Sequence, residues 1–165
     1  MDTIGQTTET TKQAGKFAVV GILNTTIDYL VLNLLVFFGF TAVFVILGQK
    51  FLVANLISVF VAMINSFILN KQWTFQSKGG NIYIQILKFV LITAIGMFVV
   101  HQIVFSLFYY DLPSISALVF SVFQFLRLDN IFSDEFIMLN FAKSIAIVVS
   151  LIWNFVGYKF FVFKR

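Results

Sequence analysis

Residues Phe17–Phe40, with the sequence FAVVGILNTTIDYLVLNLLVFFGF, contain one charged residue, Asp28. A helix of about 20 apolar residues crosses the roughly 30 Å hydrocarbon core of a bilayer. Three further runs of this kind follow at Phe51–Leu69, Ile84–Phe108 and Phe136–Gly157. None of them alternates with period two, as a lipid-facing barrel strand does, so we expect four transmembrane helices.

The composition excludes a soluble domain. Of the 165 residues, 60% are hydrophobic and 11% are charged, and the mean hydropathy is +0.98, whereas a soluble fold has about 45–50% apolar and 25% charged residues. With 23 Phe, one Pro and no Cys, the chain matches no disordered, collagen-like or disulfide-bonded class. We therefore expect an all-α membrane protein with a single transmembrane domain at residues 14–165.

Basic residues are unevenly divided between the two sides of the predicted bundle. With four spans both chain ends lie on one side, and that side collects most of the basic residues: Lys12, Lys16, Lys71, Lys78, Lys88, Lys159, Lys164 and Arg165. The other side has Lys50 and Arg127. Because basic loops resist translocation, we expect both termini on the inside. This topology accounts for the net charge of +4 without nucleic acid.

Two segments lie outside the predicted spans. Residues Ser114–Arg127 follow Pro113 and are apolar but too short to cross a bilayer. We interpret them as an extra interfacial or re-entrant helix between the third and fourth spans, or alternatively as an outward continuation of helix packing. Residues Met1–Gln13 are rich in Thr and Gln without apolar periodicity, so we expect a disordered tail on the inner side.

An internal repeat relates the second span to the fourth. The second span ends in Ser66-Phe67-x-x-Asn70-Lys71-x-Trp73-Thr74-Phe75, and the fourth ends in Asn154-Phe155-x-x-Tyr158-Lys159-x-Phe161-Val162-Phe163. Lys16-Phe17 and Lys88-Phe89 mark the inner ends of the first and third spans. We therefore expect two helical hairpins that form a parallel repeat. The alternative is that Lys and aromatic residues at helix ends are ordinary interfacial anchors.

Polar residues form stripes inside the spans. In each span the spacing of these residues places them on one face of the helix. The stripes are Asn55, Ser58, Ala62 and Asn65 in the second span, Asn140, Lys143, Ser150 and Asn154 in the fourth, and Gly21, Thr25 and Asp28 with neighbouring Asn24 in the first. We expect these faces to meet in the bundle interior. Packing of small and amide residues between helices is enough to explain Asn55, Ser58 and Ala62, but it does not explain Asp28 and Lys143.

Asp28 and Lys143 are the charged residues inside the spans that need a separate explanation. At 1.5 Å per residue, Asp28 lies about 17 Å beyond Phe17 and Lys143 about 10 Å inside the outer end of the fourth span. We expect the two to pair, because an isolated charge in hydrocarbon is costly. A purely structural ion pair and a functional pair, in which Lys143 contacts an anionic substrate, both remain open.

The sequence does not suggest catalysis. It contains no Cys, no Walker motif and no Gly-rich phosphate loop, and its one His, His101, is better explained as a hydrogen-bonding group between helices. We therefore expect neither an enzyme nor a bound cofactor or metal.

These motifs together resemble the GtrA-like family. The resemblance rests on Lys16-Phe17-x-x-x-Gly21, Asn24-Thr25 and Asp28, on the 66–75 and 154–163 segments, and on Ala142-Lys143. It implies a small four-span protein, in a bacterial cytoplasmic membrane, that moves polyprenyl-phosphate-linked sugars for cell-surface polysaccharide or teichoic-acid glycosylation, or that supports the glycosyltransferases that use them. The chain departs from the family's usual pattern at Ser66 and Lys71 and in the length of 111–135.

The resemblance and the polar residues lead to one model of the substrate site. A groove between helices would shelter the phosphate and sugar while the apolar tail stays in lipid. Lys71 and Lys159 would capture the phosphate at the inner interface, and Lys143 would offer a second site, with Asp28 as its competing partner or proton acceptor. The remaining predicted roles are hydrogen bonds from Asn24, Asn65, Asn140 and Asn154 and sugar stacking by Trp73 and Phe161.

Three function classes remain open from the sequence. The first is the translocator just described. The second is a non-transporting subunit that positions a glycosyltransferase, for which exposed surfaces such as 71–88 and 114–127 would matter most. The third, a small proton-coupled multidrug exporter, leaves Lys143 and the repeated aromatic ends unexplained. Because four helices enclose little volume, we also expect a homo-oligomer.

Overall fold

The computed structural model describes residues 2–46, 49–125, 127 and 133–163. Within these residues four helices are long and apolar enough to cross a membrane, at Gly5–Phe37, Val53–Thr74, Ile82–Tyr110 and Asp134–Val162. The four predicted spans are therefore confirmed. The chain divides into two compact units, of which unit 1 comprises Met1–Asn81 with Phe163–Arg165 and unit 2 comprises Ile82–Val162. Each unit is described by itself.

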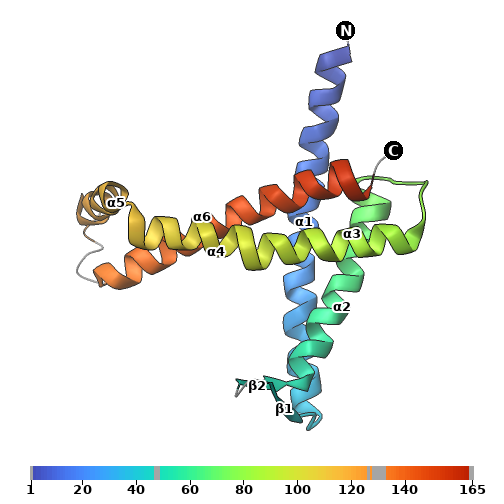
Figure 1. Cartoon of the computed structure of the whole chain (residues 1–165), viewed down its shortest axis with the longest axis horizontal. Helices are drawn as coiled ribbons and strands as arrows, with labels where there is room; N and C mark the ends of the chain where they lie inside the picture. Colours follow the sequence, from blue (N-terminus) through green and yellow to red (C-terminus); the bar gives the residue numbers. More distant parts are fainter. Residues whose placement is uncertain (1, 47–48, 126, 128–132, 164–165) are drawn as a thin grey trace. The chain divides into compact units, whose positions relative to one another are not determined.

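Unit 1 consists of two long helices joined by a short β-hairpin (Figure 1). Helix α1 (Asp2–Phe37) and helix α2 (Val53–Leu69) pack along each other, and the π-helical segment η1 (Asn70–Thr74) continues α2. Gly39 follows α1 with φ +83°, the left-handed conformation that ends many helices and that glycine adopts without strain. The chain then reverses toward α2.

The connection between the first two predicted spans contains paired strands. Strands β1 (Val43–Ile46) and β2 (Gln49–Leu52) are antiparallel, and Val43 pairs with Leu52. The rings of Phe44 and Phe51 face each other across the two strands at 5.4 Å, a cross-strand aromatic pair of the kind that stabilises sheets. Four-residue strands are too short to give a clear period-two signal, so the sequence did not predict them.

Residues 2–13, which the composition predicts as a disordered tail, form the first turns of α1. The hydroxyls of Thr10 and Thr11 donate hydrogen bonds to the carbonyls of Gln6 and Thr7, at 2.8 and 3.0 Å. Extending an existing helix fixes one residue per hydrogen bond, whereas nucleating a helix fixes several residues for one bond. A polar segment that could not form a helix alone can therefore extend the apolar helix that follows it.

Unit 2 also pairs two long helical segments (Figure 1). The first runs through α3 (Ile82–Ile95), η2 (Gly96–Val100), α4 (His101–Ser106) and η3 (Leu107–Asp111), of which η2 and η3 are π-helical. The second is α6 (Asp134–Gly157) with the π-helical η4 (Tyr158–Val162), and it packs along the first. The Ser133 hydroxyl caps α6 by accepting from the Phe136 backbone N–H at 3.2 Å.

The predicted extra helix is present as α5 (Pro113–Phe125), and it begins at the proline. It packs against α6, where Val119, Ile137 and Met138 form a buried cluster flanked by aromatic residues. This packing agrees with the predicted continuation of helix contacts. An interfacial or re-entrant position of α5 in a bilayer stays a prediction.

The repeated sequence motifs adopt the same local structure in both units. Each motif contains a five-residue π-helical segment, which is Asn70–Thr74 (η1) in the first motif and Tyr158–Val162 (η4) in the second. The burial of the six residues from Asn70 and of the six from Tyr158 follows the same order, which is one buried, one half-buried, two exposed and two buried. The two motifs therefore agree in backbone and in solvent exposure as well as in sequence.

Gly157 lies where α6 and α3 approach closely. A Cβ placed on Gly157 would lie 2.5 Å from Cγ2 of Ile92 and 3.1 Å from its Cδ1. Ile92 is β-branched and has one preferred χ1 rotamer in a helix. Its side chain could therefore move away from a Cβ at residue 157 only by losing its own packing contacts. The absence of a side chain at Gly157 thus lets the two helices pack.

We expect Gly157→Ala to lower the free energy of unfolding by about 1–3 kcal/mol, because it overpacks this contact. Reversible unfolding in mixed detergent micelles measures the change. The matched control is Gly21→Ala in α1, where a Cβ has no atom within 4 Å and alanine is the better helix former by about 1 kcal/mol. Equal effects of the two substitutions would contradict the packing role of Gly157.

Candidate functional site

A seam of paired polar side chains joins α1 and α2 in unit 1. The Asn65 amide donates to Oδ1 of Asn24 at 2.7 Å, and the Ser58 hydroxyl donates to Oδ1 of Asp28 at 2.5 Å. All four residues lie inside the candidate spans, where polar groups are costly without partners. The prediction that the polar faces of the first two spans meet is confirmed for these residues.

Two predicted members of the same faces do not join the seam. Asn55 is exposed, and its carbonyl lies 2.9 Å from the Ser58 hydroxyl. Thr25 is exposed, and its hydroxyl bonds to the Gly21 carbonyl on its own helix at 3.1 Å. The seam is therefore narrower than the sequence stripes, and it is centred on the asparagine pair and on the Asp28 carboxylate.

The polar stripe of α6 divides into two parts. Toward the η4 end, the Ser150 hydroxyl donates to the Gly96 carbonyl at 3.0 Å, and Asn154 presents a buried Oδ1 that has no hydrogen-bond partner among the described residues. Toward the other end Asn140 and Lys143 are exposed, and the Asn140 amide bonds to the Phe136 carbonyl at 2.8 Å. Their spacing predicts that all four lie on one face of α6, but only Ser150 and Asn154 pack against the first helical segment of unit 2.

Asp28 belongs to unit 1 and Lys143 to unit 2. The predicted pairing of these two residues stays a prediction. In unit 1 the Asp28 carboxylate has a neutral partner in Ser58, which lowers the cost of placing that polar group between helices.

The predicted interfacial residues lie at the ends of α2 and α6. Lys71 and Lys159 are half-buried, while Trp73 and Phe161 are 41% and 60% exposed. The Lys159 ammonium lies 5.9 Å from the Phe155 ring centre, within the range of a cation–π contact. Each helix end thus carries a lysine that is followed two residues later by an aromatic residue, as the repeat predicts.

Lys16 was predicted as a topology signal and as a marker of the repeat and the family motif, but not as a contact of Trp73. Its ammonium donates to the Trp73 carbonyl at 3.2 Å and lies 5.5 Å from the Trp73 ring centre. The sequence signal that could have found this contact is the repeat, since Lys16 and Lys88 hold matching places at the starts of the two units.

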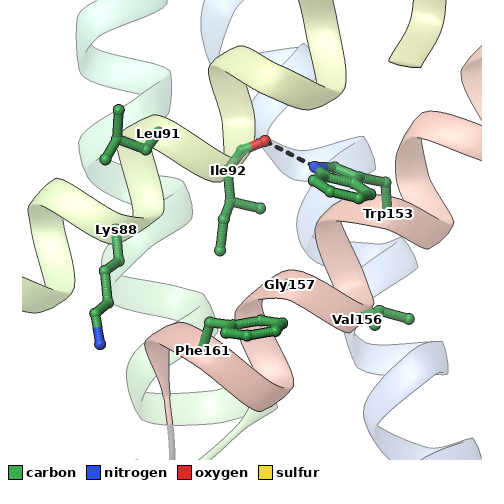
Figure 2. Close-up of a pocket in the computed structure, with 7 residues that line it drawn as sticks. All are labelled: Lys88, Leu91, Ile92, Trp153, Val156, Gly157 and Phe161. Carbon is green, nitrogen blue, oxygen red and sulfur yellow. Dashed lines mark hydrogen bonds between the residues drawn. The ribbon is translucent and has the colours of Figure 1, made fainter. Parts of the chain in front are cut away.

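Unit 2 contains an apolar pocket of about 340 Å³ between α3 and the end of α6 (Figure 2). The indole N–H of Trp153 donates to the Ile92 carbonyl at 3.1 Å and fixes one wall. Seven residues line the pocket, of which Lys88 alone is charged: Lys88, Leu91, Ile92, Trp153, Val156, Gly157 and Phe161. Sequence reasoning missed Trp153, because its place beside Ile92 depends on how α3 and α6 pack.

Four long apolar helices with a polar seam define the chain as an integral membrane protein. A family model described as GtrA/DPMS, transmembrane domain, matches residues 16–163, and the chain belongs to this family. The predicted GtrA-like resemblance is thereby confirmed. Neither the curated proteins nor the solved structures with which the chain was compared contain a match.

The Asn24–Asn65 hydrogen bond predicts a measurable coupling between α1 and α2. In a double-mutant cycle with Asn24→Ala and Asn65→Ala, we expect a coupling of about 0.6–1.7 kcal/mol in unfolding free energy, the range of such bonds in membranes. The control cycle pairs Asn65→Ala with Asn33→Ala, because the Asn33 amide bonds to the Tyr29 carbonyl on its own helix. A coupling no larger than that of the control would show that the seam does not hold the helices together.

Proposed function

We propose that this protein translocates a polyprenyl-phosphate-linked sugar across the membrane, for glycosylation of a cell-surface polysaccharide or teichoic acid. Membership in the GtrA/DPMS transmembrane family supports a role in handling lipid-linked sugars. The observation that carries the finer proposal is the polar seam of Asn24, Asn65, Asp28 and Ser58 within the spans. The protein acts in this proposal as a binding and conducting element without catalysis.

The seam suits a sugar head group for a chemical reason. Amide side chains both donate and accept hydrogen bonds, so Asn24 and Asn65 can exchange their mutual bond for bonds to sugar hydroxyls. Such an exchange keeps every polar group partnered while the head group passes through the apolar region, where an unpartnered group costs several kcal/mol. Asn140 and Asn154 would serve the same purpose in unit 2.

The apolar pocket of unit 2 suits the lipid part of the same substrate. Its walls are aliphatic and aromatic, and Lys88 at its edge supplies one positive charge (Figure 2). In this proposal an isoprenoid segment packs against Trp153 and Leu91 while Lys88 attracts the phosphate. Lys71 and Lys159 would add to that attraction at the inner interface, and Trp73 and Phe161 would stack on a sugar ring.

The parallel repeat belongs to the same proposal. Two hairpins with matching π-helical ends, each with a lysine at the predicted inner end of its first span, would offer the substrate two equivalent entrances on the inner side of the membrane. The shared burial order of η1 and η4 supports this arrangement. The distribution of basic residues supports an inward location of both ends in a bacterial cytoplasmic membrane, where homo-oligomers would enlarge the conducting groove.

A second candidate function is a non-transporting subunit that positions a membrane glycosyltransferase. The observation that favours it is the apolar surface of α5, where Leu118, Val122 and Phe125 are 64%, 49% and 87% exposed. A helix that packs on α6 with one side and exposes large apolar groups on another suits contact with lipid or with a partner protein. On this alternative α5 matters more than the seam.

Reconstitution separates the two functions. In liposomes that contain a short-chain polyprenyl-phosphate glucose, we expect the protein to accelerate appearance of the sugar in the outer leaflet, detected with an impermeant probe. Lys143→Ala should slow this roughly tenfold or more, because it removes the exposed cation proposed to contact the phosphate. Lys78→Ala, which removes an exposed cation outside the spans, is the control. Acceleration no greater than in protein-free liposomes would favour the docking subunit.

The proposed pairing of Asp28 with Lys143 requires a comparison of single and double variants. If the charges compensate each other, Asp28→Asn with Lys143→Ala should insert and translocate better than either single variant, since neither charge is left alone. The same liposome assay and the yield of folded protein measure this. A double variant that is no better than the single ones would reject the pair.

A further inference from the structure

Unit 1 contains a small polar pocket that shares no residue with the seam. It lies where the N-terminal half of α1 meets the end of η1, and its volume is about 180 Å³, which is much larger than a single water requires. Six residues line it: Glu9, Lys12, Gln13, Lys16, Thr74 and Gln76. Of these six, the translocation proposal above uses only Lys16, which marks one of its two entrances.

Two buried groups in this pocket have no hydrogen-bond partner among the described residues. These are Oε1 of Gln13, a residue that is 7% exposed, and Oγ1 of Thr74, which is 1% exposed. Buried polar atoms in folded proteins are almost always partnered. The amide oxygen accepts hydrogen bonds, while the hydroxyl both donates and accepts. Both residues line the pocket, one from α1 and one from η1, and their two unpartnered atoms lie behind its wall with almost no accessible surface of their own.

The charges around the pocket favour an anion. Lys12 and Lys16 are one helical turn apart and lie on the same side of α1, and they outnumber the one carboxylate, Glu9. The Lys16 ammonium is positioned by the Trp73 carbonyl at 3.2 Å, so it is already directed toward the end of η1. Gln76 follows η1 with φ +50°, and the Ser77 N–H closes the turn on the Lys71 carbonyl at 2.9 Å, which fixes the backbone beside Thr74.

From this arrangement we infer that the pocket binds a phosphate ester that carries hydroxyl groups. Lys12, Lys16 and the Thr74 hydroxyl donate to the phosphate oxygens, because charge-assisted hydrogen bonds are the strongest available. Gln13 Oε1 accepts from a hydroxyl of the ligand. A phosphate diester without hydroxyl groups would leave Gln13 without a donor, and a neutral sugar would leave the lysines without an anion. The ligand is either a lipid head group or a soluble sugar phosphate.

This inference depends on the proposed function only for the identity of a lipid-borne ligand. The pocket lies at the end of unit 1 near Lys16 and Trp73, where the proposed topology brings the inner interface. A head group held there would be collected before it reaches the seam. The pocket itself would exist and bind phosphate esters even in a protein that does not translocate them.

Binding measurements on the full chain test the inference. The protein is placed in phosphatidylcholine nanodiscs, and polyprenyl-phosphate glucose, polyprenyl phosphate and polyprenol are added separately and counted by native mass spectrometry. We expect the affinity to fall in that order. The double variant Lys12→Gln with Lys16→Gln and the near-isosteric Thr74→Val should each weaken binding of both phosphate ligands roughly tenfold. Gln13→Met should instead abolish the preference for the glucose-bearing ligand.

Two control variants remove the same chemical groups outside the pocket. Lys78→Gln removes an exposed lysine outside the pocket, and Thr26→Val removes an exposed hydroxyl that bonds to the Ile22 carbonyl of its own helix. Both should bind as the parent protein does. Circular dichroism and a monodisperse elution profile establish that each variant is folded. Pocket variants that bind like these controls, or polyprenol that binds as tightly as polyprenyl phosphate, would overturn the inference.

Competition identifies the source of the ligand. Glucose 1-phosphate that displaces the lipid at millimolar concentration would support the inferred chemistry with a soluble source, whereas retention of the lipid would support it with a head-group source. Translocation in liposomes is measured on the same variants. If the pocket variants lose binding but the parent protein does not translocate the lipid, the proposed function is rejected and the pocket is supported. If the parent protein translocates the lipid but the pocket variants bind it normally, the pocket is rejected and the proposed function is supported.

Discussion

The structure depends on one constraint, which is that a polar group inside a bilayer must find its partner within the protein. Helices meet this constraint for the backbone, and pairs such as Asn24–Asn65 and Ser58–Asp28 meet it for side chains. These pairs also explain why α1 and α2 adopt a particular rotation about their axes, since apolar faces alone select little between orientations in lipid. The polar seam therefore specifies the packing of unit 1 and supplies groups that can bind a passing head group.

Much of the fold could be predicted because it follows from length and hydropathy. The four spans, the extra helix after Pro113 and the facing of Asn24 with Asn65 all depend on spacing along one chain. The β-hairpin and the helical state of residues 2–13 could not be predicted, because the first depends on pairing between two short segments and the second on extension of a neighbouring helix. Composition describes a segment by itself and does not include what its neighbours contribute.

The candidate sites divide in the same way. Asp28 and Lys143 stand out in the sequence because a charge inside a span is unusual. Gln13 and Thr74 are ordinary polar residues, and only their shared burial at one pocket distinguishes them. Trp153 likewise gains its role from the Ile92 carbonyl on another helix. The roles of such residues can be recognised only when the structure shows which distant segments of the chain lie together. The sequence repeat indicates the helix ends near them but not these contacts.

The aromatic cluster at the end of unit 1 has a consequence for biosynthesis. Phe163 stacks on Phe75 with ring centres 5.4 Å apart and lies 5.6 Å from Phe67, and it is 2% exposed. More than half of the chain separates it from these two partners. While the ribosome is still making unit 2, the cluster lacks its third ring, so the first hairpin enters the membrane before its packing is complete. Packing of the first hairpin thus becomes complete only after Phe163, which follows the fourth helix, has been synthesised.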